Sequence, residues 1–230
     1  MAEPPAKQML SGRVYDELRD AILRGDFAPG AALKPQELAS AHGVSLAVVR
    51  EALVRLVGDG LAGRLTNRGF AVPLQSDQRW QDLAEARRTV EVAMLRLAIA
   101  RGDLEWEARV RAAHHLLART QAYEPGSDRV VSAAWSRAHR DFHRALLDGS
   151  GNAVLLETFD RMWLTGELAR HWAGRREPAR DHLAEHRALE EAALARDADA
   201  AAALLEQHLT QTAAGLAERA DRPAAQQAVL

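Results

Sequence analysis

The sequence predicts a mainly α-helical protein, with a small helical domain closed by a β-hairpin at the N-terminus and an antiparallel helical bundle after it. Three observations support this prediction. Apolar residues recur at helical spacing over most of the chain, extended segments are indicated only between residues 61 and 72, and breaks rich in Gly and Pro separate the periodic stretches. A chain of 230 residues can hold two modest domains, which we place at residues 1–74 and 75–230.

The N-terminal domain is predicted to begin with two helices. Apolar residues from Val14 to Ile22 form one helical face, and this helix should end near the glycines of residues 25–30. A second, short helix is expected over residues 35–42, where Gly43 breaks it. The first eight residues are polar and rich in Pro and Ala, so we expect that end to fray.

A third helix and a hairpin complete this domain. Ser45 is placed to cap the helix, because its hydroxyl can accept a bond from a free backbone N–H in the first turn. One buried stripe is predicted along it, formed by Val49, Ala52, Leu53 and Leu56. Residues 61–65 and 69–72 read as two extended pieces around a turn. Helix, helix, turn, helix and hairpin is the order of a winged helix-turn-helix.

The remaining chain reads as helix nearly to its end, after a linker at VPLQSDQ. Gly- and Pro-containing segments interrupt the apolar periodicity at residue 102 and at residues 124–128, 149–152 and 174–178. These breaks delimit roughly six helices of about 16–25 residues, a set that packs as an antiparallel bundle.

Composition narrows the possible functions. The chain has no Cys, so any metal must be held by His, Asp or Glu, and the nine His become candidate ligands. The formal net charge is −2, so the protein is not coated in positive charge for unspecific nucleic-acid binding. It shows neither an apolar run of about 20 residues nor a secretory signal, and we therefore expect a cytoplasmic protein that does not enter membranes.

Residues 30–72, GAALKPQELASAHGVSLAVVREALVRLVGDGLAGRLTNRGFAV, resemble the GntR superfamily of transcription regulators closely. The resemblance rests on a fixed order of residues: Leu33, Leu38, Ala39, Val44, Ser45, Val49, Arg50, Glu51, Ala52, Leu53, Leu56, Gly60, Leu61 and Gly69. It implies a homodimer that binds double-stranded operator DNA. The family usually has Arg after the Val-Ser pair, whereas this chain has Leu46, so its operator sequence should differ.

Candidate DNA contacts lie at the start of the third helix, where Leu46, Ala47 and Arg50 face away from the apolar stripe. Arg50 is the strongest candidate, since a planar guanidinium matches guanine or phosphate with two bonds. The alternative is a surface Arg paired to Glu51 or to a neighbour. Further candidates, each also typical of a solvated surface, are Lys34, Gln36, Ser45, Arg64, Thr66 and Arg68.

The helical region resembles the FCD domain of the FadR subfamily, in the stretches 82–98, 139–152 and 185–208. The resemblance implies a divalent metal beside a carboxylate effector. Its ligand positions fall on His139, His143, His186 and His208, with His139 standing where the family has Asp. Arg87 matches a family Arg near the effector, and Asn152 matches a family turn, although a helix N-cap explains Asn152 equally well.

The residues themselves support the histidine set. His139 and His143 are four residues apart and project from one helical face, whereas Asp141 points away from that face. His186 lies beside Leu183 and Leu189, and His208 lies among leucines, so both should point inward. Buried imidazoles need hydrogen bonds or a metal, and zinc, nickel or manganese would suit them. We take His171 and His182 as alternates and His42, His114 and His115 as surface residues.

Two other classes of function are alternatives to a regulator that senses a small organic acid. A helical di-iron enzyme needs Glu-x-x-His twice, and none of the nine His has Glu three residues earlier. The sequence also has no His-Glu-x-x-His motif and no Walker loop, so we expect no enzyme. The other alternative is a helical scaffold whose histidines are structural.

Overall fold

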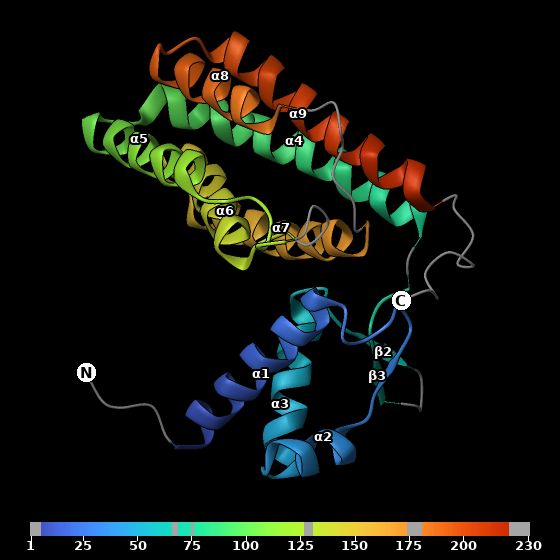
Figure 1. Ribbon diagram of the computed structural model, residues 1–230. Helices are drawn as coiled ribbons and strands as arrows, with labels where there is room; N and C mark the ends of the chain where they lie inside the picture. Colours follow the sequence, from blue (N-terminus) through green and yellow to red (C-terminus); the bar gives the residue numbers. More distant parts are fainter. Residues whose placement is uncertain (1–5, 66–68, 75, 127–130, 174–180, 221–230) are drawn as a thin grey trace. The chain divides into compact units, whose positions relative to one another are not determined.

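A computed structural model describes residues 6–65, 69–74, 76–126, 131–173 and 181–220 (Figure 1). The chain divides into two compact units. The first contains the chain up to Ser76 together with Leu164–Trp172, and the second contains Asp77–Trp163 and the chain from Ala173 onward. The mainly helical class predicted from the sequence is confirmed.

The first unit contains the predicted helices in the predicted order. They are α1 (Ala6–Arg24), α2 (Pro35–His42) and α3 (Leu46–Gly58). Helix α1 begins well before the first apolar position of its buried face. Gly43 ends α2 in a left-handed conformation, φ 63°, which glycine adopts without strain. Ser45 caps α3 as predicted, since its side chain accepts a hydrogen bond from the backbone N–H of Val48.

Three short strands complete this unit: β1 (Ala32–Leu33), β2 (Gly63–Leu65) and β3 (Gly69–Ala71). They form an antiparallel sheet in the order β1-β3-β2. The β2–β3 hairpin was predicted, and β1 was not. In β1, Leu33 pairs with Phe70 of β3 and is itself buried. The small sheet therefore ties the wing to the segment that leads into α2.

Helices α1 and α3 pack against each other through the predicted apolar stripe. Val49, Ala52, Leu53 and Leu56 are fully buried, and Val48 joins them. Polar bonds reinforce this packing. The Tyr15 hydroxyl donates to Asp59 at 2.5 Å, and the Ser11 hydroxyl donates to Glu51 at 2.9 Å. These contacts hold α3 in a fixed orientation on α1, with its opposite face free for other contacts.

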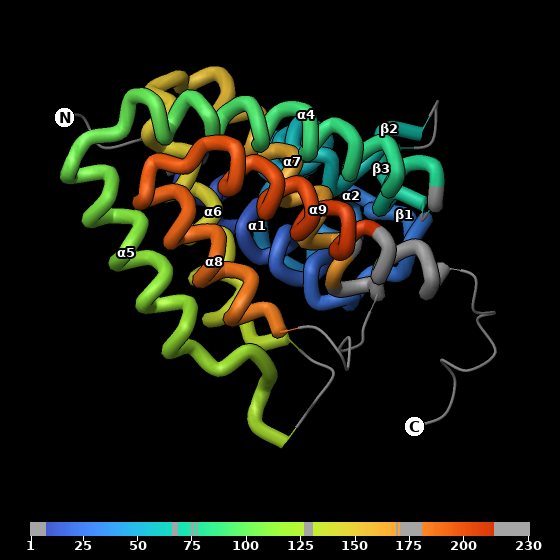
Figure 2. Tube along the Cα trace, turned by 90° about the horizontal axis from the view of Figure 1, so that it is seen from above, coloured from blue at the N-terminus to red at the C-terminus, as the bar shows by residue number. Residues whose placement is uncertain are grey.

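Six helices belong wholly or largely to the second unit. They are α4 (Asp77–Arg101), α5 (Leu104–Arg119), α6 (Ala133–Asp148), α7 (Ala153–Ala173), α8 (His182–Leu194) and α9 (Ala198–Ala220). Helix α4 runs beside α9, α8 packs on α9, and α5 contacts both α6 and α8 (Figures 1 and 2). The bundle was predicted, although α8, with 13 residues, is shorter than expected. No described helix is both long and apolar enough to cross a membrane.

One corner of the bundle is built around Trp106. Its indole N–H donates to the carbonyl of Ala145 at 3.0 Å, and its ring lies against Gly102 and Gly149. A Cβ at Gly102 would come within 2.3 Å of that ring. The sequence predicted only that both glycines end helices. The structure shows that they also provide the space into which the indole of Trp106 packs.

Candidate metal centre and DNA-binding helix

The candidate DNA-reading residues of α3 lie at its exposed N-terminal end. Arg50 and Ala47 are exposed and Leu46 is partly buried, on the side opposite the apolar stripe. Arg50 forms no hydrogen bond or ion pair with any described residue. Its alternative partner, Glu51, instead accepts a bond from Ser11. The guanidinium of Arg50 is therefore available to another molecule.

The weaker DNA candidates among the described residues lie at the start of α2, at the cap of α3 and on β2. Ser45, Gln36 and Arg64 are exposed, whereas Lys34 is held by Glu37, with 2.8 Å between Nζ and the carboxylate. Thr66 and Arg68 lie outside the described residues. Our sequence reasoning missed Val54, which is 45% exposed and lies one turn beyond Arg50 on the same face. The signal in the sequence was an apolar, branched residue four positions after Arg50, which places both side chains on the same face of the helix.

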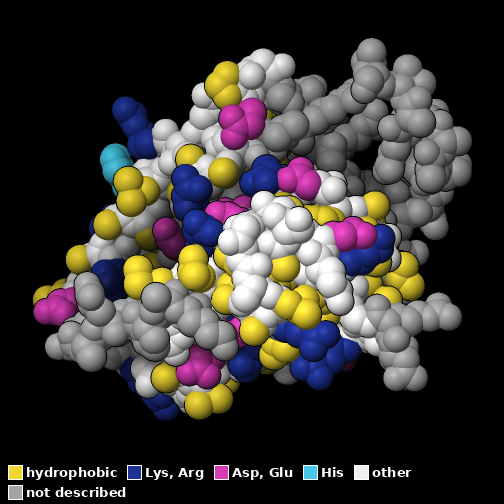
Figure 3. All heavy atoms as spheres, turned by 90° about the horizontal axis from the view of Figure 1, so that it is seen from below, with side chains coloured by type: hydrophobic (Ala, Val, Ile, Leu, Met, Phe, Trp, Pro, Cys, Tyr) yellow, Lys and Arg dark blue, Asp and Glu magenta, His cyan; other side chains and the backbone are white. Residues whose placement is uncertain are grey.

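Charged side chains of both signs are present on the described part of the face that Figure 3 shows. Figure 3 shows Lys and Arg side chains interspersed with Asp, Glu and apolar side chains on the face it presents. This agrees with the net charge of −2. The net charge gives the chain no overall positive field, so the individually placed cations of the first unit are the candidates for contacts with DNA phosphates.

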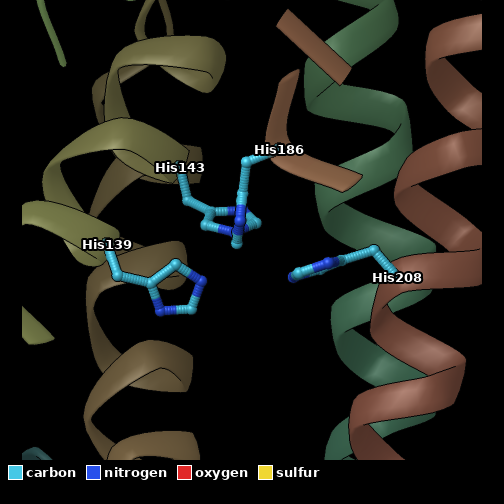
Figure 4. Close-up of side chains that lie close together, drawn as sticks. All are labelled: His139, His143, His186 and His208. Atoms are coloured by element: carbon cyan, nitrogen blue, oxygen red, sulfur yellow. The ribbon is translucent and has the colours of Figure 1, made fainter. Parts of the chain in front are cut away.

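The four predicted histidines come together in the second unit. His139 and His143 lie on α6, His186 on α8 and His208 on α9, and all four are buried. One ligand nitrogen from each lies within 4.8 Å of all the others. Figure 4 shows the rings converging on one centre, with His139 and His143 on one side and His208 on the other. Three helices thus contribute to one cluster of imidazoles.

Hydrogen bonds set the orientation of two of these rings. Nδ1 of His186 lies 2.6 Å from the carbonyl oxygen of His182, and Nδ1 of His208 lies 2.9 Å from Oε2 of Glu185. Each Nδ1–H therefore donates outward, which leaves the lone pair on Nε2. Nε2 of His186 is 3.3 Å from Nε2 of His143. That distance fits a hydrogen bond between the two rings and also the ligand edge of a tetrahedron with metal–nitrogen bonds of about 2.0 Å, whereas the four ligand nitrogens lie within 4.8 Å of one another.

The surroundings keep the imidazole of His186 in the form that binds metal. Burial, and after it the nearby His208, lowers the pKa of His186 well below its usual range. His186 is therefore neutral at physiological pH, and only a neutral imidazole coordinates an ion. His139 lies between two indoles, stacked on Trp135 at 4.5 Å and edge-on to Trp163 at 5.1 Å. Buried neutral nitrogen donors in an aromatic frame fit zinc, nickel or manganese.

The other histidines divide differently from our expectation. His115 is exposed as predicted, but the prediction for His114 was wrong: it is buried, and its Nδ1 lies 2.5 Å from a carboxylate oxygen of Glu190. The reason is that α5 packs on α8 along the side that carries His114. His42 is partly buried against Glu17.

The remaining candidates are the alternate histidines His182 and His171 and the leucines near His186. The alternate His182 contributes its carbonyl rather than a ring nitrogen, and the side chain of the other alternate, His171, lies outside the described residues. Leu189 is buried beside His186 as expected, whereas Leu183 is 46% exposed.

The effector candidates sit in contrasting settings. Arg87 is buried and bonds Glu91, one turn further along α4, with 2.6 Å between Nε and Oε1 and 3.3 Å between Nη2 and Oε2. Its guanidinium also lies 5.2 Å from the ring of Trp163, which contacts His139 and His143. Asn152 is exposed and acts as the N-cap of α7, accepting bonds from the backbone of Val154 and Leu155.

Family models match both units of the chain. Residues 10–72 match the bacterial regulatory proteins of the gntR family, and residues 82–211 match the FCD domain. The chain belongs to the GntR family, in its FadR/FCD subfamily. It is a transcription regulator with an FCD effector-binding domain, and not an enzyme.

Similar proteins agree with this assignment. The HTH-type transcriptional repressor GlaR of Escherichia coli (strain K12) is 34% identical over 200 residues, 85% of this chain and 90% of the repressor. The regulator BphR of Paraburkholderia xenovorans is 36% identical over 196 residues, 85% of this chain and 80% of BphR. A GntR regulator from Rhodococcus sp. RHA1 has a TM-score of 0.71 at 30% identity, covering 90% of this chain and 96% of its own.

The Arg87–Glu91 pair yields a stability prediction for this GntR regulator. Arg87→Ala should lower the free energy of unfolding by about 3–5 kcal/mol, because it leaves the fully buried Glu91 carboxylate without its partner. Replacing both residues, as Arg87→Met with Glu91→Leu, should cost far less. Urea unfolding followed by tryptophan fluorescence measures both changes, and Arg88→Ala is the matched control. A double variant no more stable than Arg87→Ala would contradict this account.

Proposed function

We propose that this regulator binds a pseudo-palindromic operator as a homodimer and that a small carboxylate effector controls its operator affinity. The effector would bind beside a divalent ion held by His139, His143, His186 and His208. The observation that carries the ligand-sensing part is the convergence of four buried imidazoles within 4.8 Å. Reading of DNA is assigned to α3 and to the hairpin of the first unit.

The geometry of α3 supports the DNA-binding role. A recognition helix enters the major groove with its N-terminal residues, and Ala47 and Arg50 are exposed at that end. The available guanidinium of Arg50 can form two bonds to guanine or contact a phosphate. Val54 and Leu46 add apolar contacts suited to thymine methyl groups. Two copies are needed, because one such helix covers only a few base pairs.

The chemistry of the cluster supports a divalent ion. Its four candidate ligands cancel none of the charge of a bound ion when they are neutral, so the ion would attract an anion. If the ion takes five or six ligands, it would also offer an open position to a carboxylate. The guanidinium of Arg87 contacts the ring of Trp163, and that ring also contacts His139 of the cluster. Glu91 already holds Nε and Nη2 of Arg87, so an effector would use its remaining N–H groups or displace Glu91.

Operator recognition should depend on Arg50. Arg50→Ala should weaken operator binding by about 1–3 kcal/mol and relax base preference. Arg68→Ala should instead lower the affinity for all DNA sequences more evenly. A selected operator and random duplex DNA, titrated at two salt concentrations, measure both effects, with the exposed Arg111→Ala as control. A protein that prefers no double-stranded site over random DNA would exclude this role.

Metal content should depend on the four histidines. Protein purified without chelator should carry about one divalent ion per chain, and His143→Ala and His208→Ala should each lose it, whereas the exposed His115→Ala should not. Occupancy should fall on acidification, since protons compete for the imidazoles, and the lowered pKa of His186 moves the competition at that ring below the ordinary imidazole value of about 6.5. Elemental analysis measures each case. Substoichiometric metal in the parent, or undiminished metal in both ligand variants, would instead indicate structural histidines.

An effector should change operator affinity through the metal-loaded domain. Coupling of this kind typically amounts to about 1–3 kcal/mol, or roughly 5–150-fold in affinity. A thermal-shift screen of organic acids, with and without added metal, identifies the effector, and operator titration with that acid measures the coupling. The matched amide, which lacks the carboxylate charge, is the control. Equal operator affinity with and without a confirmed effector would refute the coupling.

A further inference from the structure

The first turn of α8 carries groups that orient two candidate ligands. His186 directly follows this turn, and the carbonyl of His182 accepts from its Nδ1. Glu185, the residue just before His186, reaches across to α9 and contacts Nδ1 of His208 at 2.9 Å. Asp181 caps the turn, accepting a bond from the backbone N–H of Ala184 at 3.0 Å. The turn is thus held at its start and bonded to two rings of the cluster.

The two orienting acceptors differ in charge. A carbonyl oxygen is neutral, and it fixes the tautomer of His186 without altering the charge near the cluster. The Glu185 carboxylate fixes the tautomer of His208. It also places a negative charge on the side of the His208 ring that faces away from the candidate metal position. A carboxylate in this position raises the basicity of the ring nitrogen that faces the ion.

The charges around the cluster show why this matters. The four candidate ligands carry no negative charge when neutral, and the nearby buried cation, Arg87, is already balanced by Glu91. A divalent ion in a buried site is stabilised by negative charge nearby. Glu185 supplies this negative charge through its contact with His208. The side chain of Glu185 is 25% exposed, and that of His208 is 7% exposed.

We propose that Glu185 is a positioning residue of the metal centre. Its carboxylate holds His208 with Nε2 toward the ion and contributes the negative charge that the four imidazoles lack. This inference rests on the metal site proposed above. It assigns to Glu185 a role in metal affinity and in the tautomer of His208, without direct contact to the ion.

The test measures metal affinity in the full-length chain. Protein stripped of metal is titrated with Zn²⁺ in competition with a chromophoric chelator, as the parent, Glu185→Gln and Glu185→Ala. We expect Glu185→Ala to bind Zn²⁺ about 10–100-fold more weakly than the parent, with Glu185→Gln also weakened because its amide can accept the bond but carries no charge. Glu191→Gln removes an exposed carboxylate from the same helix and should bind like the parent. Circular dichroism verifies that each variant is folded.

A second readout needs no metal. Nitrogen NMR of the histidine rings at pH 8, where imidazoles with an ordinary pKa of about 6.5 are neutral, reports which ring nitrogen carries the proton. In the metal-free parent, His208 should be protonated on Nδ1, and in Glu185→Ala the other tautomer should gain population while His186 is unchanged.

Each outcome has one meaning. Weakened Zn²⁺ binding together with the tautomer change supports the role of Glu185. A parent that binds Zn²⁺ while either Glu185 variant binds equally tightly overturns this role and leaves the metal site standing, as does a parent His208 protonated on Nε2. A parent that binds no Zn²⁺ overturns the metal site itself, and the inference with it.

Discussion

The arrangement of the second unit depends on burying four imidazoles at one point. Ring nitrogens taken out of water must find hydrogen bonds, protons or a metal, and each solution requires the rings to be close and well oriented. Helices α6, α8 and α9 therefore have to meet at fixed heights and rotations. The bonds to the His182 carbonyl and to Glu185, and the two indoles around His139, meet the same requirement.

Local sequence signals predicted most of the fold because its elements are local. The Pro35–His42 helix, the Ser45 cap and the apolar stripe of α3 depend on residues within one or two turns of each other. Strand β1 escaped prediction because two residues carry no periodicity, and they are a strand only through pairing with β3, far along the chain. The early start of α1 was a missed signal, since Leu10 lies four residues before Val14 at helical spacing, although Met9 and Leu10 are both exposed in the structure.

The candidate site was predictable in its ligands and less so in its supporting groups. His139 and His143, four residues apart on one helix, gave a geometric signal in the sequence itself. Glu185 orients His208 from another helix, and His114 is buried by the packing of α5 on α8, so both depend on distances between helices. Glu91 was a missed signal, because its spacing of four residues from Arg87 is that of a helical ion pair.

The position of Glu185 and the His182 carbonyl in the first turn of α8 has a consequence for how fast a bound ion would exchange. Helix ends open at lower free energies than helix interiors, because fewer hydrogen bonds must break. Opening this turn would break the bond of His186 to the His182 carbonyl and release His208 from Glu185 at the same time, while the contacts of α4 with α9 stay formed. Exchange of a bound ion would then be limited by local fraying of one turn, at a rate far above that of global unfolding. Strengthening the Asp181 cap would slow exchange without altering the ligands.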